Sequence, residues 1–242
     1  MIKFFRHIRY NLMETRKTGK YFKYAIGEIV LVVIGILIAL QINNWNEYRK
    51  QQDTLNNIYV TIKTDLQEDI KKIDKIISAS EPLEAQYLAI INKTRKREDF
   101  NNCENCWKVN LGYSDIKLRY NGINLLLDYN KLNSNTNDSL SIKISRLYNG
   151  LANDIQIDNT ELSKDTEAYL NIIASTKSWF PNLVKDEFTD EFIEYALTDV
   201  AYRNYATMIH YVYFVKYMPD LKGFKSQGLE FIEQINKRLN ND

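Results

Sequence analysis

Glycine and proline are scarce in this sequence, whose 242 residues include 8 Gly and 3 Pro. A β-sandwich or barrel needs a turn about every 8–12 residues, and these two residue types are the strongest turn signals. The low count therefore argues against an all-β architecture and predicts an all-α fold. Charged residues make up 26% of the chain, so most of it is suited to water.

Catalytic motifs are also missing. The sequence contains no G-x-S-x-G, no P-loop, no H-E-x-x-H and no paired catalytic constellation. Acidic sets such as Asp65, Glu68 and Asp69, or those within residues 186–191, are interleaved with lysines, which is typical of solvated helix faces. We therefore expect no enzyme activity, no catalytic residues and no cofactor.

One long apolar run stands out, because Ile29 to Leu40 contains only Ile, Leu, Val, Ala and Gly. We predict a transmembrane helix over residues 25–44, since 18 helical residues rise about 27 Å and a hydrocarbon core is roughly 30 Å thick. Glu28 lies in the first turn, at headgroup depth, where a carboxylate suits the positive end of the helix. Aromatic residues typical of a membrane interface flank the run on both sides: Tyr21, Phe22, Tyr24, Trp45 and Tyr48.

Two alternatives fit this run less well. The buried helix of a soluble protein is seldom apolar all round with basic residues directly before it. A cleaved signal peptide needs a small-x-small site after the run, and "LQINNW" offers none, so we expect a retained signal-anchor. Within the span, Gly35 and Ala39 form a small-xxx-small pair, which allows close helix packing and hence a homodimer.

Charge is distributed unevenly along the chain. Residues 1–24 contain seven basic residues and one acidic residue, whereas residues 45–242 contain 25 basic and 29 acidic residues. Because positive flanks stay in the cytoplasm, we expect residues 1–24 to be cytoplasmic and residues 45–242 to form a periplasmic domain, with the span in the inner membrane.

The basic tip itself has an amphipathic pattern. Its apolar residues Phe4, Phe5, Ile8 and Leu12 lie near one helical face among basic residues, which predicts contact with anionic membrane lipid. DNA binding is the alternative, but no docking motif is visible, so we expect no nucleic-acid partner.

The segments "MIKFFRHIRYNL" and "GKYFKYAIGEIVLVVIGILIALQINNWNE" resemble the N-terminal signature of an uncharacterised family of small membrane proteins of Bacteroidota-type bacteria, which is classified as a domain of unknown function. Further along, "INLLLDYNKLN" is similar to the general layout of that family. The resemblance implies a single-span protein with an extracytoplasmic helical domain. The resemblance assigns no catalytic residues to this chain, because the family has no established activity.

Apolar spacing predicts helices along the remaining chain. A heptad-like seam follows the span, at Trp45, Tyr48, Gln52, Leu55, Tyr59, Ile62 and Leu66. It fits either a coiled-coil stalk or a helix that packs on its own domain, and Gln52 favours the second. We expect Pro82 to end this helix near Ser80.

Five further helices complete a predicted antiparallel helical bundle. They cover residues 83–94, residues 115–129, a stretch from a cap at Asn137 or Asp138 to about Ser178, a stretch from Thr189 to about Met218 that Pro219 ends, and residues 228–239.

Cys103 and Cys106 form a C-x-x-C pair in "NCENCW". A zinc site needs about four ligands, which one chain with histidines only at positions 7 and 210 cannot supply. A thioredoxin-like redox pair needs a βαβ context, which is missing. A local disulfide in an oxidising compartment is the simplest interpretation, and closing so small a ring stabilises a loop by roughly 2 kcal/mol. A redox role, or an intermolecular metal or disulfide bond, remains an alternative.

Tyrosine is abundant, with 17 residues that are densest over positions 195–217. Helical spacing places most of them in the core. Tyrosine also suits binding surfaces, because it buries a large area at a small entropic cost. Tyr205, Tyr213 and Tyr217 are therefore candidates for an aromatic binding surface, whereas His210 is expected to be a core or interface residue.

Together these patterns predict a single-pass membrane protein whose periplasmic helical domain docks onto another envelope protein or acts as a scaffold. A ligand-sensing helical bundle is one alternative, and it predicts a closed, partly apolar pocket. An envelope redox accessory that uses Cys103 and Cys106 is the other.

Overall fold

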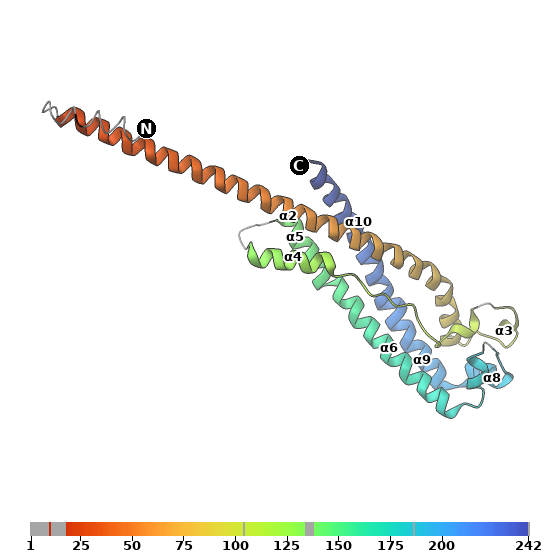
Figure 1. Cartoon of the computed structure of the whole chain (residues 1–242). Helices are drawn as coiled ribbons and strands as arrows, with labels where there is room; N and C mark the ends of the chain where they lie inside the picture. The colour runs from red at the N-terminus through yellow and green to blue at the C-terminus, as the bar shows by residue number, and fades with distance from the viewer. Residues whose placement is uncertain (1–9, 11–17, 104, 134–137, 186, 242) are drawn as a thin grey trace. The chain divides into compact units, whose positions relative to one another are not determined.

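The computed structural model describes residues 10, 18–103, 105–133, 138–185 and 187–241. Every regular element in these ranges is helical (Figure 1), which confirms the predicted all-α fold. The chain divides into two compact units, Met1–Asn56 and Asn57–Asp242. Each unit is described by itself below.

The longest element is α2 (Thr18–Ile91), a helix of 74 residues that contains the whole apolar run. We predicted that Pro82 would end this helix, and that prediction is wrong. Buried positions continue beyond the proline, since Tyr87 and Ile90 are 2% and 4% exposed. Burying such side chains stabilises a fold by about 1.5–3 kcal/mol each, which offsets the roughly 3 kcal/mol cost of an interior proline. The helix bends in its final part (Figure 1).

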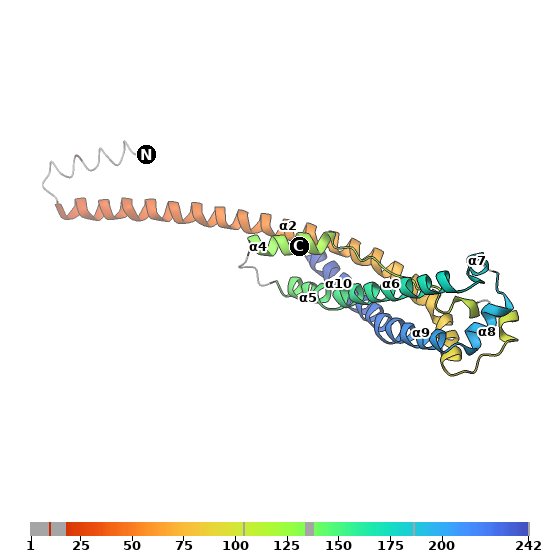
Figure 2. The same ribbon diagram turned by 90° about the horizontal axis from the view of Figure 1, so that it is seen from below.

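The second unit contains the remaining helices. They are α3 (Asp99–Asn102), η1 (Cys106–Lys108), α4 (Asn121–Leu132), α5 (Ser139–Asn149), α6 (Leu151–Thr176), α7 (Phe180–Leu183), α8 (Asp190–Thr198), α9 (Val200–His210), η2 (Tyr211–Tyr217) and α10 (Met218–Asn241). Helix α6 lies alongside the continuous helix that η2 and α10 form end to end (Figure 2). Their contact encloses a core that includes Tyr202, Tyr217 and Phe224, each fully buried.

Two predicted helix caps are present. The Asp138 side chain accepts a hydrogen bond from the backbone N–H of Ser141 at the start of α5, and Thr189 does the same for Phe192 at the start of α8. Asn137, the other predicted cap of α5, lies outside the described residues. The single helix predicted from this point to Ser178 is instead two helices, because Gly150 takes a non-helical ψ of −102° between them.

The predicted break at Pro219 is also absent. Helix α9 is followed directly by the π-helical segment η2 and then by α10, which contains this proline. A π-helical turn is wider than an α-helical turn, so it reduces the clash between the proline ring and the preceding carbonyl groups. The break lies earlier, at Asp199, whose side chain caps α9 by accepting from the Tyr202 N–H at 2.9 Å.

Residues 112–120 are extended, although we predicted a helix from Asp115. Ile116 and Leu118 are buried and Lys117 between them is exposed, which is the two-residue period of an extended chain. Side chains from helices bind the backbone of this segment. Asn159 Nδ2 donates to the Ile116 carbonyl at 2.7 Å, and the tyrosine hydroxyl of Tyr213 lies 3.4 Å from the Ser114 carbonyl. Tertiary contacts therefore replace the bonds that a helix would have made.

Candidate functional site

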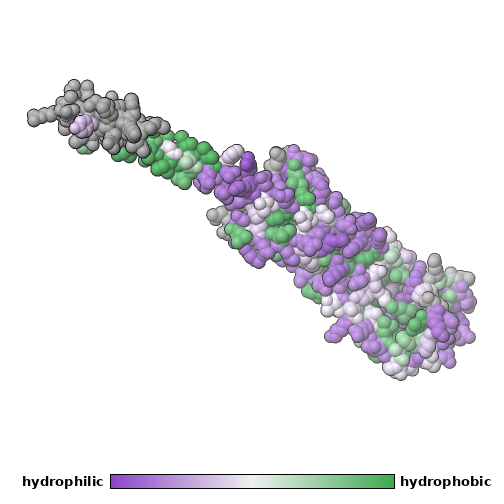
Figure 3. All heavy atoms as spheres, viewed as in Figure 1, coloured by the Kyte–Doolittle hydropathy of each residue, from purple (hydrophilic) through white to green (hydrophobic). Residues whose placement is uncertain are grey.

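The apolar run of α2 is exposed on all sides. Its ten large apolar side chains are between 47% and 63% exposed, and they form a continuous hydrophobic surface along the helix (Figure 3). Within the described residues, α2 is the one helix that is long and apolar enough to cross a membrane, with a mean hydropathy of 2.6 over its most apolar stretch. Water is an unfavourable solvent for such a surface.

The residues predicted to flank or pack this run are arranged around the same helix. Trp45 and Tyr48 are 61% and 59% exposed, and the Arg49 guanidinium lies 5.4 Å from the Trp45 ring. Among the described residues, no atom outside the helix's own backbone lies within 4 Å of a Cβ added at Gly35, and Ala39 is exposed. Glu28 is partly buried and lies well inside α2, which begins at Thr18, so the predicted position in the first turn is wrong. The side chain of Tyr24 lies outside the described residues.

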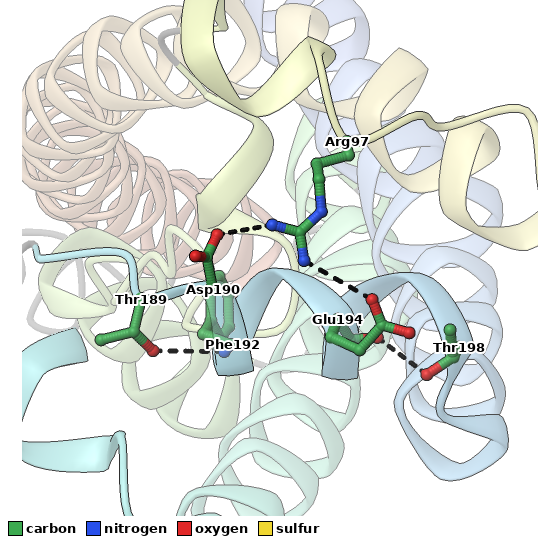
Figure 4. Close-up of polar contacts among 6 residues, drawn as sticks. All are labelled: Arg97, Thr189, Asp190, Phe192, Glu194 and Thr198. Atoms are coloured by element: carbon green, nitrogen blue, oxygen red, sulfur yellow. Dashed lines mark hydrogen bonds and ion pairs between the residues drawn. The ribbon is translucent and has the colours of Figure 1, made fainter.

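Cys103 and Cys106 lie at the bonding distance of a disulfide, with their Sγ atoms 2.00 Å apart. They lie in the segment of residues 95–110, which we call the cysteine loop, and this loop contacts α8. Arg97 forms ion pairs with Asp190 and, at 3.6 Å, with Glu194 (Figure 4). Further along the loop, the Trp107 ring stacks on Phe188 at 5.0 Å, and the Asn110 side chain donates to the Tyr202 carbonyl at 3.0 Å. The cysteine loop is therefore held in place from several sides.

Arg95 lies beside the two cysteines, and the sequence analysis did not identify it. Its Nη1 lies 2.6 Å from Cys106 Sγ, and its Nη2 donates to Gln86 Oε1 on α2. Burial lowers the pKa of the Arg95 guanidinium, while nearby Asp99 opposes that shift. No motif in the sequence indicated this pairing, because it depends on how the loop folds back against α2.

The predicted aromatic binding surface is largely absent. Tyr213 and Tyr217 are 2% and 0% exposed, so they pack in the core, and their rings stack at 5.5 Å. The Tyr213 hydroxyl lies 2.6 Å from Ser80 Oγ in α2. Tyr205 is partly buried and stacks on Tyr169 at 4.2 Å. Burial raises the pKa of all three candidate tyrosines, Tyr205, Tyr213 and Tyr217.

His210 lies close to the same cluster, on α9. Its Nε2 is 3.5 Å from Glu84 Oε1 of α2, and its ring lies 5.4 Å from that of Phe214. His210 is partly buried and Glu84 is half exposed, so the histidine lies at the edge of the core. Among the described residues, no group of three or more His, Cys, Asp or Glu side chains could hold a metal ion.

Two carboxylates of α2 that we interpreted as solvated are buried. Asp65 accepts from the Gly122 N–H at 2.8 Å, and it serves as a cap from outside for α4, which has no side-chain cap of its own. Asp69 accepts from the Arg119 N–H at 2.8 Å and lies 3.2 Å from Arg119 Nη1. Desolvation raises the pKa of Asp69, although the hydrogen bonds and charge of Arg119 oppose this. The exposure prediction was wrong because Arg119 pairs with Asp69 and the start of α4 lies against Asp65.

The raised pKa of Asp69 predicts a pH dependence. The folded chain binds the Asp69 proton more tightly than the unfolded chain does. The stability contributed by Asp69 therefore decreases as pH rises from 3.8 through the raised pKa of the folded state. We expect Asp69→Asn to change the free energy of unfolding by less than about 1 kcal/mol at pH 4. Its stability relative to the natural chain should rise towards pH 7. Urea unfolding followed by the fluorescence of buried Trp179 measures this difference.

Glu68→Gln is the matched control, since Glu68 is half exposed and only 3.7 Å from Arg119. Comparing the two variants separates the effect of burial from that of the shared arginine, because only Asp69 is fully buried. If the stability of Asp69→Asn relative to the natural chain instead fell with rising pH, the effect of Arg119 on the Asp69 pKa would outweigh that of desolvation.

The π-helical segment η2 carries a second polar cluster that the sequence did not indicate. Lys216 Nζ lies 2.8 Å from Asp158 and 3.1 Å from Glu161, both on α6, and these hydrogen bonds raise the pKa of Lys216. Near this cluster, a groove of about 490 Å³ runs between α6 and the extended segment and opens to solvent. Its lining residues include Tyr113, Lys117, Asn159 and Lys164.

Comparison with protein families matches residues 28–211 to DUF6090, a family of unknown function. The match includes the apolar run, the cysteine loop and most of the helical unit. No curated protein matches the chain, and no solved structure does.

Proposed function

This chain belongs to DUF6090, a family of unknown function, and we propose that it is a single-pass inner-membrane protein whose periplasmic helical domain docks onto another envelope protein. The exposed apolar run of α2 carries this proposal. Ten large apolar side chains around one helix would cost free energy in water and gain it in lipid. The basic residues that precede them favour a cytoplasmic N-terminus, and hence a periplasmic location for the residues after the span.

A docking role is supported by the surface of α9 and η2. Val200, Met208, Tyr211 and Val215 are between 37% and 59% exposed. Their helical spacing places them on one side of the element, and an apolar strip of this kind suits a protein partner. The ligand-sensing alternative has less support, because the groove beside α6 is open to solvent, whereas such a sensor calls for an enclosed pocket.

A photoreactive side chain placed at Tyr211 in the full chain tests the docking proposal in native membranes. We expect a crosslink to one defined envelope protein, because this strip would be covered in the complex. Ile172 on α6 is the matched control position, since its exposed fraction of 59% is nearly that of Tyr211 at 58%. Equal crosslinking from both positions, or none from either, would contradict docking through this strip.

An alkaline phosphatase fused after residue 242 tests the orientation separately. The enzyme is active only outside the cytoplasm, because its disulfides form there. We expect activity. An inactive fusion of normal abundance would place the helical domain in the cytoplasm.

A further inference from the structure

We propose that Cys103 and Cys106 form a thiol–disulfide exchange site, in which an external thiolate attacks Cys103 and Cys106 leaves as a thiolate beside Arg95. The inference does not depend on the docking proposal. It rests on the unequal access to the two sulfur atoms and on the surroundings of Arg95.

The two cysteines differ in exposure. Cys106 is 1% exposed, whereas Cys103 is only partly buried. An incoming thiolate therefore reaches Cys103 more easily, and a disulfide is opened by attack on one of its two sulfur atoms while the other leaves. The arrangement assigns the attacked position to Cys103 and the leaving position to Cys106.

The guanidinium of Arg95 is placed to stabilise that leaving thiolate. Nη1 lies 2.6 Å from Cys106 Sγ and 4.0 Å from Cys103 Sγ. Its other hydrogen-bond partner is the neutral Gln86 amide, and Nε is buried without a partner among the described residues. The Asp99 carboxylate is near enough to act on this charge, but the side-chain hydrogen bond goes to a neutral amide, so the partly desolvated cation gains a closer counterion when Cys106 becomes a thiolate.

Other polar groups lie near the two sulfur atoms. The Asp99 carbonyl oxygen lies 3.8 Å from Cys106 Sγ, and the Tyr202 hydroxyl donates to the Val109 carbonyl further along the loop. Gln86 Oε1 lies 3.5 Å from Cys103 Sγ and can accept from that thiol after reduction. Glu104, between the cysteines, lies outside the described residues, and the experiment below includes Glu104→Gln for that reason.

The exchange balances with two equivalents of an external thiol. The first thiolate forms a bond to Cys103 Sγ, the Cys103–Cys106 bond breaks, and its electron pair stays on Cys106. A second thiolate attacks the external sulfur of the mixed disulfide and releases Cys103, which takes up a proton. The cysteine pair is reduced by two electrons, and the two external thiols become one disulfide. A cation that stabilises the reduced form makes the pair a better oxidant.

The test uses the full chain in detergent micelles, equilibrated with reduced and oxidised glutathione. We compare the natural chain with Arg95→Met and with Arg97→Met, the matched control whose guanidinium pairs with α8 instead. One pKa unit corresponds to a factor of ten in an equilibrium constant. We therefore expect Arg95→Met to lower the equilibrium constant for reduction about tenfold at a pH about one unit above the ordinary thiol pKa of roughly 8.5, where Cys106 is largely ionised in both chains, and Arg97→Met and Glu104→Gln to change it less than about threefold.

A second measurement does not need the Arg95 variant to fold. In a Cys103→Ser chain, the pH dependence of the ultraviolet absorbance of the thiolate, taken as the difference from a chain in which both cysteines are serine, reports the pKa of the buried Cys106 thiol without a reagent having to reach it. We expect a midpoint at least about one unit below the ordinary value of roughly 8.5, and Arg95→Lys should keep most of that shift. Either of two results would overturn the proposal: a Cys106 pKa at or above roughly 8.5, or equal equilibrium constants in the natural, Arg95→Met and Arg97→Met chains. The disulfide would then only stiffen the loop.

Discussion

A chain that carries both Ile34→Arg and Leu37→Arg is expected to leave the membrane fraction. The eight large apolar side chains that remain in the run favour insertion by about 2–5 kcal/mol in total, whereas two arginines near the centre of a span oppose it by about 5–7 kcal/mol. One arginine alone should therefore weaken insertion, and two should abolish it. Extraction of membranes at alkaline pH, followed by detection of the chain in pellet and supernatant, measures the outcome.

Leu125→Arg combined with Leu132→Arg is the control for added charge. Both leucines lie on α4 and are 50% and 85% exposed, so arginine there replaces surface that already faces solvent. This variant should stay in the pellet with the natural chain. Release of the natural chain by the alkaline wash would contradict the membrane span itself, and with it the proposed inner-membrane location.

Gly122→Ala is expected to destabilise the helical unit by about 3 kcal/mol, at the upper end of what overpacking costs. An added Cβ would lie 2.6 Å from Ile62 Cγ1 and 2.7 Å from both the Cα and the backbone nitrogen of Ile62. The backbone of α2 cannot move away as a side-chain tip can, so α4 must shift. That shift would also lengthen the hydrogen bond from the Gly122 N–H to the buried Asp65 carboxylate.

Thermal unfolding of the full chain in detergent, followed by near-ultraviolet circular dichroism of the buried tyrosines, measures this loss. Gly223→Ala is the matched control. Its added Cβ would lie 3.2 Å from Leu151 Cδ1, the end of a flexible side chain, and alanine raises helix propensity by about 1 kcal/mol. We expect the control to unfold at or slightly above the natural temperature. Equal losses in the two variants would mean that the close approach of α2 and α4 is not needed for stability.

Several features of the fold follow from local physical chemistry, and they could be predicted from the amino-acid order. Helix caps depend on one side chain and the backbone two or three residues later, so Asp138 and Thr189 were identified correctly. The apolar run depends on composition alone, and the all-α fold depends on the scarcity of turn residues. The C-x-x-C spacing likewise indicated that its sulfur atoms could meet.

Other features depend on partners that are distant in the sequence. Pro82 and Pro219 lie inside helices because packing beyond each of them outweighs a local cost. The segment before α4 is extended because Asn159 and Tyr213 bind its backbone. Asp65 and Asp69 look like surface residues until the start of α4 and Arg119 lie against them.

The candidate redox site shows the same division. Spacing along the chain brings Cys103 and Cys106 together, but the position of Arg95 and Gln86 beside them arises where the loop meets α2. A short-range feature depends on only a few neighbouring residues, so it can be predicted from the sequence. A buried charge acquires its partner only when separate helices exclude water together, and the energy of that step depends on distances that no linear pattern contains.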